Sequence, residues 1–379
     1  MEEKNKMEIK ITEEQTYEMV EMLEEFYTSL NNITDYYLHK KLERLGQKEY
    51  TDITDHIFND YTMNPMDMDI TLEEIDEGTF TNFTTQIATF PIEPQIGRRM
   101  TFGLKENNTN KYLGFIRIAS PVSSIAPRNE YFGGKLPLTK VNKHFYNGQT
   151  IVPVQPFGYN YLGGKLVALA CISNEVKDLF NKKYNSDVCV FETTSLYGDD
   201  KQVSMYDGLK PYIKYKGLTQ SKNTLNPTDE IYFTIRDICR SLYGREEWNG
   251  RVVVPKGTSP KTREYNEVLK IMKTHLQHYN EGKLKEFNDM MKEYSITKQR
   301  KRYYMSSFGY DNVIEHILND EPLHRPNGDK YDFNNLVDYW KKKSYNRWTK
   351  LQEQNRLETE QQIYTIDLIK NGINFETIR

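Results

Sequence analysis

The chain has 379 residues, of which 37% are hydrophobic and 28% are charged, and its formal net charge is −3. The three cysteines, Cys171, Cys189 and Cys239, form no CxxC pair, which excludes a zinc ribbon and a disulfide framework. The N-terminus lacks the apolar core of a signal peptide, and no run approaches the roughly 18 apolar residues of a membrane span. We therefore expect a soluble, cytoplasmic protein with no membrane partner and a length sufficient for two or three domains.

Charge is unevenly distributed along the chain. Residues 1–80 carry 7 basic and 21 acidic side chains, whereas residues 81–244 carry 20 basic and 13 acidic ones and residues 245–379 carry 24 and 20. An ordinary solvated surface explains this pattern. A functional alternative is an acidic lobe that docks a protein partner or masks a basic groove.

The N-terminal region, residues 1–95, is predicted to be acidic and mainly helical. Residues 12–30 have apolar positions at three- and four-residue spacing, and Thr12 with Gln15 forms a capping-box pattern. A second helix is predicted over residues 35–46, ending at Gly46. Residues 51–95 contain short strand or helix segments that the pattern does not resolve.

The central region, residues 96–250, is predicted to form a mixed α/β core. Its apolar patterns predict a hairpin over residues 98–121, a strand over 150–157, one helix over 162–184, a buried strand over 187–194, and β or mixed elements over 212–220 and 231–238. This order indicates an α+β fold with a mixed central sheet and at least one crossover helix.

The C-terminal region, residues 251–379, is predicted to be helical. Apolar residues recur at helical spacing from residue 258 onwards, and a segment containing two prolines interrupts the pattern near residue 322. A long final helix is predicted from Asp332 to about Lys370, with Asn371-Gly372 as its end.

The first candidate site is the glycine pair between the strand and the helix of the core, in the stretch Pro156–Ile172. A helix N-terminus presents free backbone N–H groups that bind phosphate. Gly163, Gly164 and Lys165 are therefore candidate cofactor ligands, together with Val154 on the preceding strand. The alternative is a tight turn, because neither a GxGxxG nor a Walker motif is present.

Two polar segments of the core are candidates for catalysis. The loop around residues 120–135 contains Arg128, which suits a bidentate contact to a phosphate or a carboxylate, and Asn129. Glu192 follows a buried strand, where desolvation raises the pKa of a carboxyl group towards that of a general base. With Tyr206 these residues form the predicted catalytic set. The alternatives are an ordinary ion pair for Arg128 and a structural hydrogen bond for Glu192.

Two runs in the C-terminal region alternate basic and aromatic residues, a composition that binds phosphates and stacks on bases. They are TKQRKRYYMSSFGY and YWKKKSYNRWTK, and their predicted nucleic-acid contacts are Arg300, Lys301, Arg302, Lys342 and Arg347. The alternative for the second run is that its aromatic residues form the buried stripe of a helix. No metal site is predicted, because His275 and His278 have no completing ligand pattern and are expected at the surface.

Several motifs in residues 112–222 occur together in one order, and this stretch resembles the Druantia DruA family. Members of that family occur in anti-phage systems, in phages and beside transposases. The residues that carry the resemblance are Arg128, Asn129 and Gly133, then Asn142, then Gly163 to Ala170, then Glu192-Thr193, and finally Gly217 and Thr219. The resemblance covers about a third of the chain and implies a function directed at nucleic acid.

The order of the predicted elements is also similar to the GNAT acyltransferase fold and to phage Mom-type enzymes that modify DNA. That similarity implies a sheet that opens at the glycine–helix unit to hold an acyl-CoA-like or a nucleotide cofactor. In the corresponding run, Asn160-x-x-Gly163-x-Lys165, only the glycine agrees with the acyl-CoA pattern.

Two functions follow as expectations from these resemblances. The first is a GNAT-like transferase that modifies DNA bases, with Glu192 as the base. The second is a DNA-binding or assembly subunit of a defence, phage or transposition system that has no chemistry of its own.

Overall fold

The computed structural model describes residues 9–30, 33–46, 48–92, 97–195, 204–219, 226–253, 260–296 and 300–366. The chain divides into two compact units, each assembled from two separate stretches. Unit 1 comprises Met1–Glu43 and Lys222–Lys298, and unit 2 comprises Arg44–Ser221 and Gln299–Arg379. These units cut across the three regions predicted from composition.

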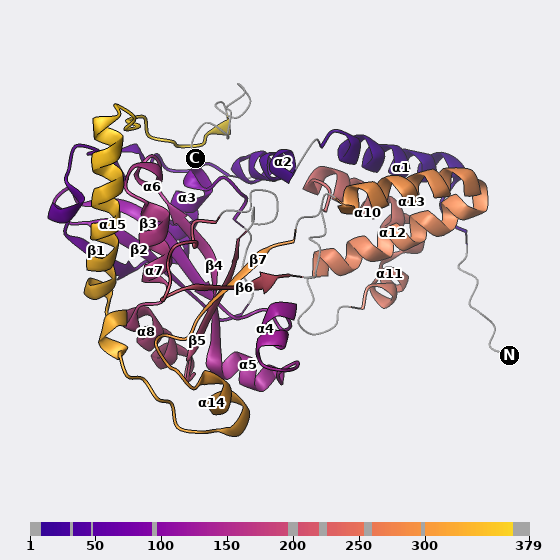
Figure 1. The fold of residues 1–379 in the computed structure, drawn as a ribbon. Coiled ribbons are helices and arrows are strands. Elements are labelled where there is room, and N and C mark those ends of the chain that lie inside the picture. The colour runs from indigo at the N-terminus through magenta and orange to yellow at the C-terminus, as the bar shows by residue number, and fades with distance from the viewer. Residues whose placement is uncertain are drawn as a thin grey trace. The chain divides into compact units, whose positions relative to one another are not determined.

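The secondary-structure elements described in unit 1 are all helices (Figure 1). Its helices are α1 (Glu13–Thr28), the greater part of α2 (Ile33–Leu45), α10 (Asp229–Tyr243), α11 (Arg245–Arg251), α12 (Pro260–Tyr279) and α13 (Glu281–Ile296). The predicted capping box is present, with the Thr12 side chain accepting from Gln15 N and the Gln15 side chain accepting from Thr12 N. Both N-terminal helices thus form where the sequence predicts them.

Residues 231–238 are helical and not β, which corrects the prediction for this segment. They lie within α10, whose buried residues Tyr232, Ile235, Cys239 and Tyr243 follow helical spacing. The Thr228 side chain accepts a hydrogen bond from Ile231 N and caps the helix. The short window IYFTIRDI is rich in β-branched and aromatic residues, but the longer period and the cap decide the structure.

Unit 2 contains a mixed sheet of seven strands, in the order β1-β2-β3-β4-β5-β7-β6 (Figure 1). The strands are β1 (Ile70–Glu74), β2 (Arg99–Glu106), β3 (Lys111–Ala119), β4 (Phe145–Pro153), β5 (Val190–Ser195), β6 (Lys214–Leu218) and β7 (Arg302–Ser306). Only β4 and β5 pair in parallel, and the other neighbouring strands are antiparallel. The sheet and its helices confirm the predicted α+β class at this level.

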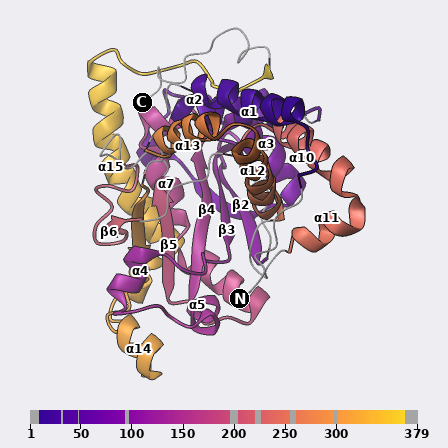
Figure 2. The same cartoon turned by 90° about the vertical axis from the view of Figure 1, so that its right-hand side faces the viewer.

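Helices cover both faces of this sheet. They are α3 (Glu77–Ile87), α4 (Ala126–Tyr131), α5 (Leu138–His144), α6 (Phe157–Asn160), α7 (Gly163–Ala170), α8 (Asn174–Tyr184), α14 (Val313–Asn319) and α15 (Phe333–Glu353), with short 3-10 turns at Thr54–His56, Pro65–Asp67 and Gly328–Tyr331. Figure 2 shows α15 beside α7.

Side chains point alternately to the two faces of the sheet along each strand, and their contacts show which face each helix covers. On β3, Phe115 stacks on Phe83 of α3, whereas a Cβ built on the neighbouring Gly114 would meet Val167 of α7. On β4, Phe145 packs on Phe132 beside α4, whereas Tyr146 packs on Phe180 of α8. Successive residues of a strand point to opposite faces, so α7 and α8 lie across the sheet from α3 and from α4 respectively.

The crossover between β4 and β5 consists of three short helices and not of one helix over 162–184. Ser173 separates α7 from α8, and its side chain accepts a hydrogen bond from Val176 N. A serine at a helix N-cap begins a new helix, even though the apolar spacing continues through it. The sequence rule for caps would have detected this break.

Both outer regions contribute strands to the sheet, although the pattern of residues 51–95 left strand and helix open and the C-terminal region was predicted to be helical. Ile70–Glu74 pairs with β2, so the N-terminal region adds an edge strand to the sheet. Arg302–Ser306 lies between β5 and β6, so the C-terminal region supplies an interior strand. The final helix ends at Glu353, before a left-handed Asn355 (φ 50°), and not near Lys370. The predicted end at Asn371-Gly372 falls outside the described residues.

Within the described residues, no helix combines the length and the apolar composition needed to cross a membrane.

Candidate functional site

Arg128 and Glu192 of the predicted catalytic set form a buried ion pair in unit 2. The Arg128 Nη1 atom donates to both carboxylate oxygens of Glu192, at 2.9 and 3.1 Å, and the Tyr303 hydroxyl donates to Glu192 Oε2 at 2.8 Å. Arg128 is 0% exposed and Glu192 is 2% exposed. Helix α4 supplies the arginine, β5 the glutamate and β7 the tyrosine, so three separate segments build this centre.

The electrostatics of this centre reflect its isolation from water. Burial raises the pKa of the Glu192 carboxyl, and the Arg128 charge and the Tyr303 hydrogen bond oppose that rise. The Arg128 Nη2 atom donates to the Val122 carbonyl at 2.8 Å, and the guanidinium lies 5.4 Å from the centre of the Phe145 ring. The two opposite charges compensate each other in the core, as in a structural buried ion pair. Because both side chains are buried, a substrate reaches them only if the loop that precedes α4 moves away.

The other two predicted catalytic residues lie away from the carboxylate. Asn129 points from α4 to Ser124, with Nδ2 donating to Oγ at 3.0 Å, and its buried Oδ1 has no partner among the described residues. Tyr206 packs on the Tyr304 ring at 5.0 Å. Tyr304 follows Tyr303 on β7, and adjacent strand residues point to opposite faces. The sheet therefore separates Tyr206 from Glu192.

The predicted cofactor residues make close contacts with the protein itself. A Cβ at Gly163 would lie 2.5 Å from the Phe157 ring, so glycine is required there for packing. A Cβ at Gly164 would meet Met205 Sδ at 3.2 Å, and Val154 is fully buried. Lys165 donates from Nζ to the carbonyl oxygens of Met205, at 3.3 Å, and of Asp207.

The contacts of Gly164 and Lys165 place the segment 204–209 over the first turn of α7. Residues 204–209 lie against Gly164 and Lys165, and the Trp340 Nε1 of α15 donates to the Tyr161 and Leu162 carbonyls at 3.0 and 3.2 Å. Burial lowers the pKa of Lys165, and the nearby Lys343 charge lowers it further. In this conformation the protein covers the turn at which a cofactor was expected.

The predicted nucleic-acid contacts divide between two places. Arg300, Lys301 and Arg302 surround the start of β7: Arg300 is exposed, Lys301 N donates to Thr219 Oγ1 at 3.0 Å, and the Arg302 guanidinium lies 4.6 Å from the Tyr215 ring centre. Lys342 and Arg347 belong to α15. Lys342 is exposed, whereas the Arg347 guanidinium lies 4.7 Å from the Tyr159 ring centre.

Sequence reasoning missed the basic residues of β6, the edge strand beside β7. Lys214 and Tyr215 are exposed, and the ammonium of Lys216 lies 3.9 Å from the centre of the Tyr131 ring. We call Lys214, Tyr215, Lys216 and Arg302 the β6-edge surface. Asp207 is its acidic neighbour, with Oδ1 at 3.4 Å from Arg302 Nη2. The alternation of Tyr and Lys in YIKYKG was the available signal for this surface.

The two histidines that were expected at the surface differ from each other. His278 is exposed, but His275 is 0% exposed, which corrects the prediction for that residue. Its Nε2 accepts a hydrogen bond from Lys10 N at 3.0 Å, and its Nδ1 lies 2.8 Å from the Ile271 carbonyl oxygen. The helical stripe of α12 faces a neighbouring segment at this point, which residue spacing does not indicate. All three cysteines are buried and unbridged.

Comparison with known proteins agrees with the resemblance in the core. The family model described as Druantia protein DruA matches residues 27–242, more than half of the chain. The Druantia protein DruA of Escherichia coli (strain UMEA 4076-1) is 25% identical over 191 residues, which cover 45% of this chain and 46% of that relative. The match thus spans about half the length of the relative. No solved structure matches the chain. On the extent of the family match, the chain belongs to the Druantia protein DruA family.

Proposed function

We propose that this protein is a nucleic-acid-binding component of an anti-phage defence system and that it contacts DNA through the β6-edge surface. The observation that supports the proposal is the exposure of Lys214 and the Tyr215 ring on one edge strand, beside the half-buried Lys216 and Arg302. Edge lysines alone would serve to block strand pairing between molecules. An exposed aromatic ring among cations adds a surface on which bases stack.

The β6-edge surface places its groups on both sides of the strand. Lys216 lies against Tyr131 of α4, whereas Tyr215 packs near Tyr304 and Arg302. Cations on both sides of an edge strand can neutralise the phosphates of a nucleic-acid backbone that runs along that edge. Burial lowers the pKa of Lys216, and the nearby Lys214 charge adds to this shift, so a bound phosphate relieves a repulsion already present.

The test is the salt dependence of DNA binding, measured by fluorescence anisotropy with duplex DNA, single-stranded DNA and RNA of equal length. Each phosphate contact contributes about 0.9 to the slope of log affinity against log salt for duplex DNA. Reversing two charges, Lys214→Glu with Lys216→Glu, is expected to lower that slope by about 2 and to weaken binding on every sequence. The matched control is Lys182→Glu, because Lys182 is an exposed lysine of α8.

Tyr215→Ala tests the aromatic part of the surface. Loss of base stacking is expected to weaken binding of single-stranded DNA by about 1–3 kcal/mol while leaving the salt slope unchanged. A DNA affinity that does not change with salt concentration contradicts the proposal, and so does an equal loss of affinity in the Lys182→Glu control. If the protein binds RNA more tightly than both forms of DNA, the β6-edge surface remains the proposed binding surface, but its ligand is RNA and not DNA.

The second candidate is a GNAT-like transferase that modifies DNA bases, and the pairing of β4 with β5 favours it. Their parallel register covers only Phe145–Asn147 with Val190–Glu192, after which the two strands no longer pair. The hairpin β2–β3, the crossover helices and β5 also follow in the expected order. Residues 204–209 now lie over α7, so this function requires that segment to move when a cofactor binds.

Nucleoside mass spectrometry distinguishes the two candidates. Cells that express the chain with its defence partners are compared with cells that express Glu192→Gln, a variant that keeps the shape of the carboxyl group. A modified nucleoside that disappears in the variant supports the transferase, and an unchanged nucleoside profile counts against it. The protein partner expected for the acidic N-terminal region remains a prediction.

A further inference from the structure

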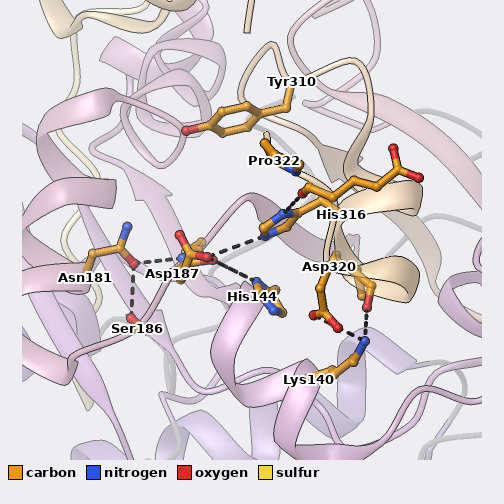
Figure 3. Close-up of polar contacts among 12 residues, drawn as sticks. Lys140, His144, Asn181, Ser186, Asp187, Tyr310, His316, Asp320 and Pro322 are labelled. Carbon is orange, nitrogen blue, oxygen red and sulfur yellow. Dashed lines mark hydrogen bonds and ion pairs between the residues drawn. The ribbon is translucent and has the colours of Figure 1, made fainter. Parts of the chain in front are cut away.

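We propose that His144, Cys189 and His316 form a binding site for a first-row transition metal ion of the Zn²⁺ type. One ligand atom from each residue lies within 4.8 Å of the other two, although 45 and 127 residues separate them along the chain. His144 ends α5, Cys189 immediately precedes β5 and His316 lies on α14. Figure 3 shows the two histidines meeting around Asp187.

The backbone fixes two of these residues side by side. Cys189 N donates to the His144 carbonyl at 3.0 Å, and Asp187 N donates to the Lys143 carbonyl at 3.0 Å. Helix α14 is held against them because Val313 and Ile317 pack in the same apolar cluster as Cys189. The three residues are therefore held by the start of β5 and by the packed helices α5 and α14.

Hydrogen bonds fix the tautomers of both imidazoles. His316 Nδ1 lies 2.6 Å from the Glu321 carbonyl oxygen, and His144 Nδ1 lies 3.1 Å from the Asp187 carbonyl oxygen. A carbonyl oxygen only accepts, so the proton of each neutral ring is on Nδ1 and the lone pair is on Nε2. Metal-bound histidines are oriented by this same kind of contact to a carbonyl group.

The fourth ligand position is next to Asp187. His316 Nε2 is buried and has no hydrogen-bond partner among the described residues, yet it lies 3.4 Å from Asp187 Oδ2. A lone pair that faces a carboxylate is repelled unless a cation lies between them. Nitrogen and oxygen ligands at about 2.0–2.2 Å from a tetrahedral ion lie roughly 3.4 Å apart, which matches this separation.

The chemistry of the donors selects the metal. Two imidazoles and a thiol suit Zn²⁺, Co²⁺ or Ni²⁺, whereas Mg²⁺ and Ca²⁺ require oxygen ligands. The thiolate, and not the thiol, is the form of cysteine that binds a metal. Binding therefore releases the thiol proton to solvent as the metal–sulfur bond forms. The side chain of Asp187 is 49% exposed, which gives the ion a route from solvent.

The test is the metal content of the full chain. The purified protein is loaded with Zn²⁺, dialysed, and measured by elemental mass spectrometry, and Co²⁺ is bound in a parallel sample. We expect one ion per chain and a thiolate-to-cobalt charge-transfer band in the near ultraviolet. Cys189→Ser is expected to remove the band, and His316→Ala is expected to weaken Zn²⁺ binding at least tenfold.

Two matched variants serve as controls. Cys171→Ser removes a buried thiol elsewhere in the sheet unit, and His324→Ala removes an exposed imidazole that contacts Asp311. Both are expected to bind metal as the wild type does. A wild-type chain that binds no Zn²⁺ and shows no cobalt band overturns the proposal, and leaves an ion pair of protonated His316 with Asp187 as the reason for their contact. Equal loss in the controls overturns it as well.

Discussion

At the scale of single residues, the Arg128–Glu192 pair is the most isolated charge contact described in unit 2. The sequence marks both residues as candidates, but 64 positions separate them and Tyr303 lies 111 positions beyond Glu192. Their pairing depends on α4 packing over the face of the sheet on which the Glu192 side chain of β5 lies. A pair of buried charges stabilises a fold only while both partners are present.

A double-mutant cycle measures this dependence. Glu192→Leu is expected to lower the free energy of unfolding by about 3–5 kcal/mol, because it leaves the Arg128 charge buried without its partner. Arg128→Met has a similar expected cost, and the double variant costs less than the sum of the two. Urea denaturation followed by circular dichroism gives the three values. Additive losses would show that the two side chains do not act as a pair, and the exposed Glu130→Ala serves as control.

Gly163 provides a second prediction at this scale. Gly163→Ala places a methyl group 2.5 Å from the Phe157 ring, so the free energy of unfolding is expected to fall by about 1–3 kcal/mol. Gly134→Ala is the matched control, because a Cβ there meets nothing within 4 Å, and its effect is expected to stay within about 0.5 kcal/mol. Equal thermal stability of the two variants contradicts the packing explanation and favours a glycine kept for a ligand.

At the scale of elements, helix N-caps leave a readable signal in the sequence. The capping box of α1 was visible in the sequence, and Ser173 and Thr228 cap α8 and α10 with hydroxyl groups of the same kind. The strand β7 was not predictable, because its basic N-terminal residues suggested a surface run. Tyr303 and Tyr304 on it are nevertheless buried on opposite faces, since the strand lies between two others.

The cap of α3 yields a prediction with a pH dependence. Asp76 accepts hydrogen bonds from Gly78 N, Thr79 N and Thr79 Oγ1, and the Thr79 side chain is the main cause that lowers the pKa of Asp76. A lowered folded-state pKa stabilises the fold above the ordinary value of about 3.9, and this contribution is lost as the pH falls through the folded-state pKa. Asp76→Ala is therefore expected to lower the melting temperature at neutral pH.

The difference between wild type and Asp76→Ala is expected to shrink as the pH falls below about 4, because the wild-type carboxylate is then protonated. Asp76→Asn keeps an acceptor for the cap and serves as control, with a smaller loss at neutral pH. Thermal melts by circular dichroism across this pH range measure both effects. A difference that stays constant into acid would assign the loss to the helix alone and not to the charge.

At the scale of the whole molecule, two compact units are interleaved along one chain. The three tryptophans report on them separately: Trp248 lies in unit 1, and Trp340 and Trp348 lie in unit 2. All three are buried, so the fluorescence of each changes when its own unit unfolds. Units with separate cores are able to unfold in separate transitions.

We expect guanidinium denaturation of a Trp248→Phe variant to follow unit 2 alone, and that of a variant with Trp340→Phe and Trp348→Phe to follow unit 1 alone. Adding Gly163→Ala is expected to lower the midpoint of the unit 2 transition and to leave the unit 1 midpoint unchanged. Circular dichroism on each variant confirms that it is folded before denaturant is added. Equal shifts in both transitions would show that the units unfold as one.

The sequence by itself determined the local features of this protein: the capped helix α1, the hairpin β2–β3 and the α+β class. Each of these depends on residues close together in the chain, where spacing, caps and turns act directly. The tertiary structure alone decided which distant groups meet: Arg128 with Glu192, the β6-edge surface, and the His144–Cys189–His316 cluster. Residue spacing does not predict these contacts, because the order of the strands and the packing of the helices bring the side chains together only when the chain folds.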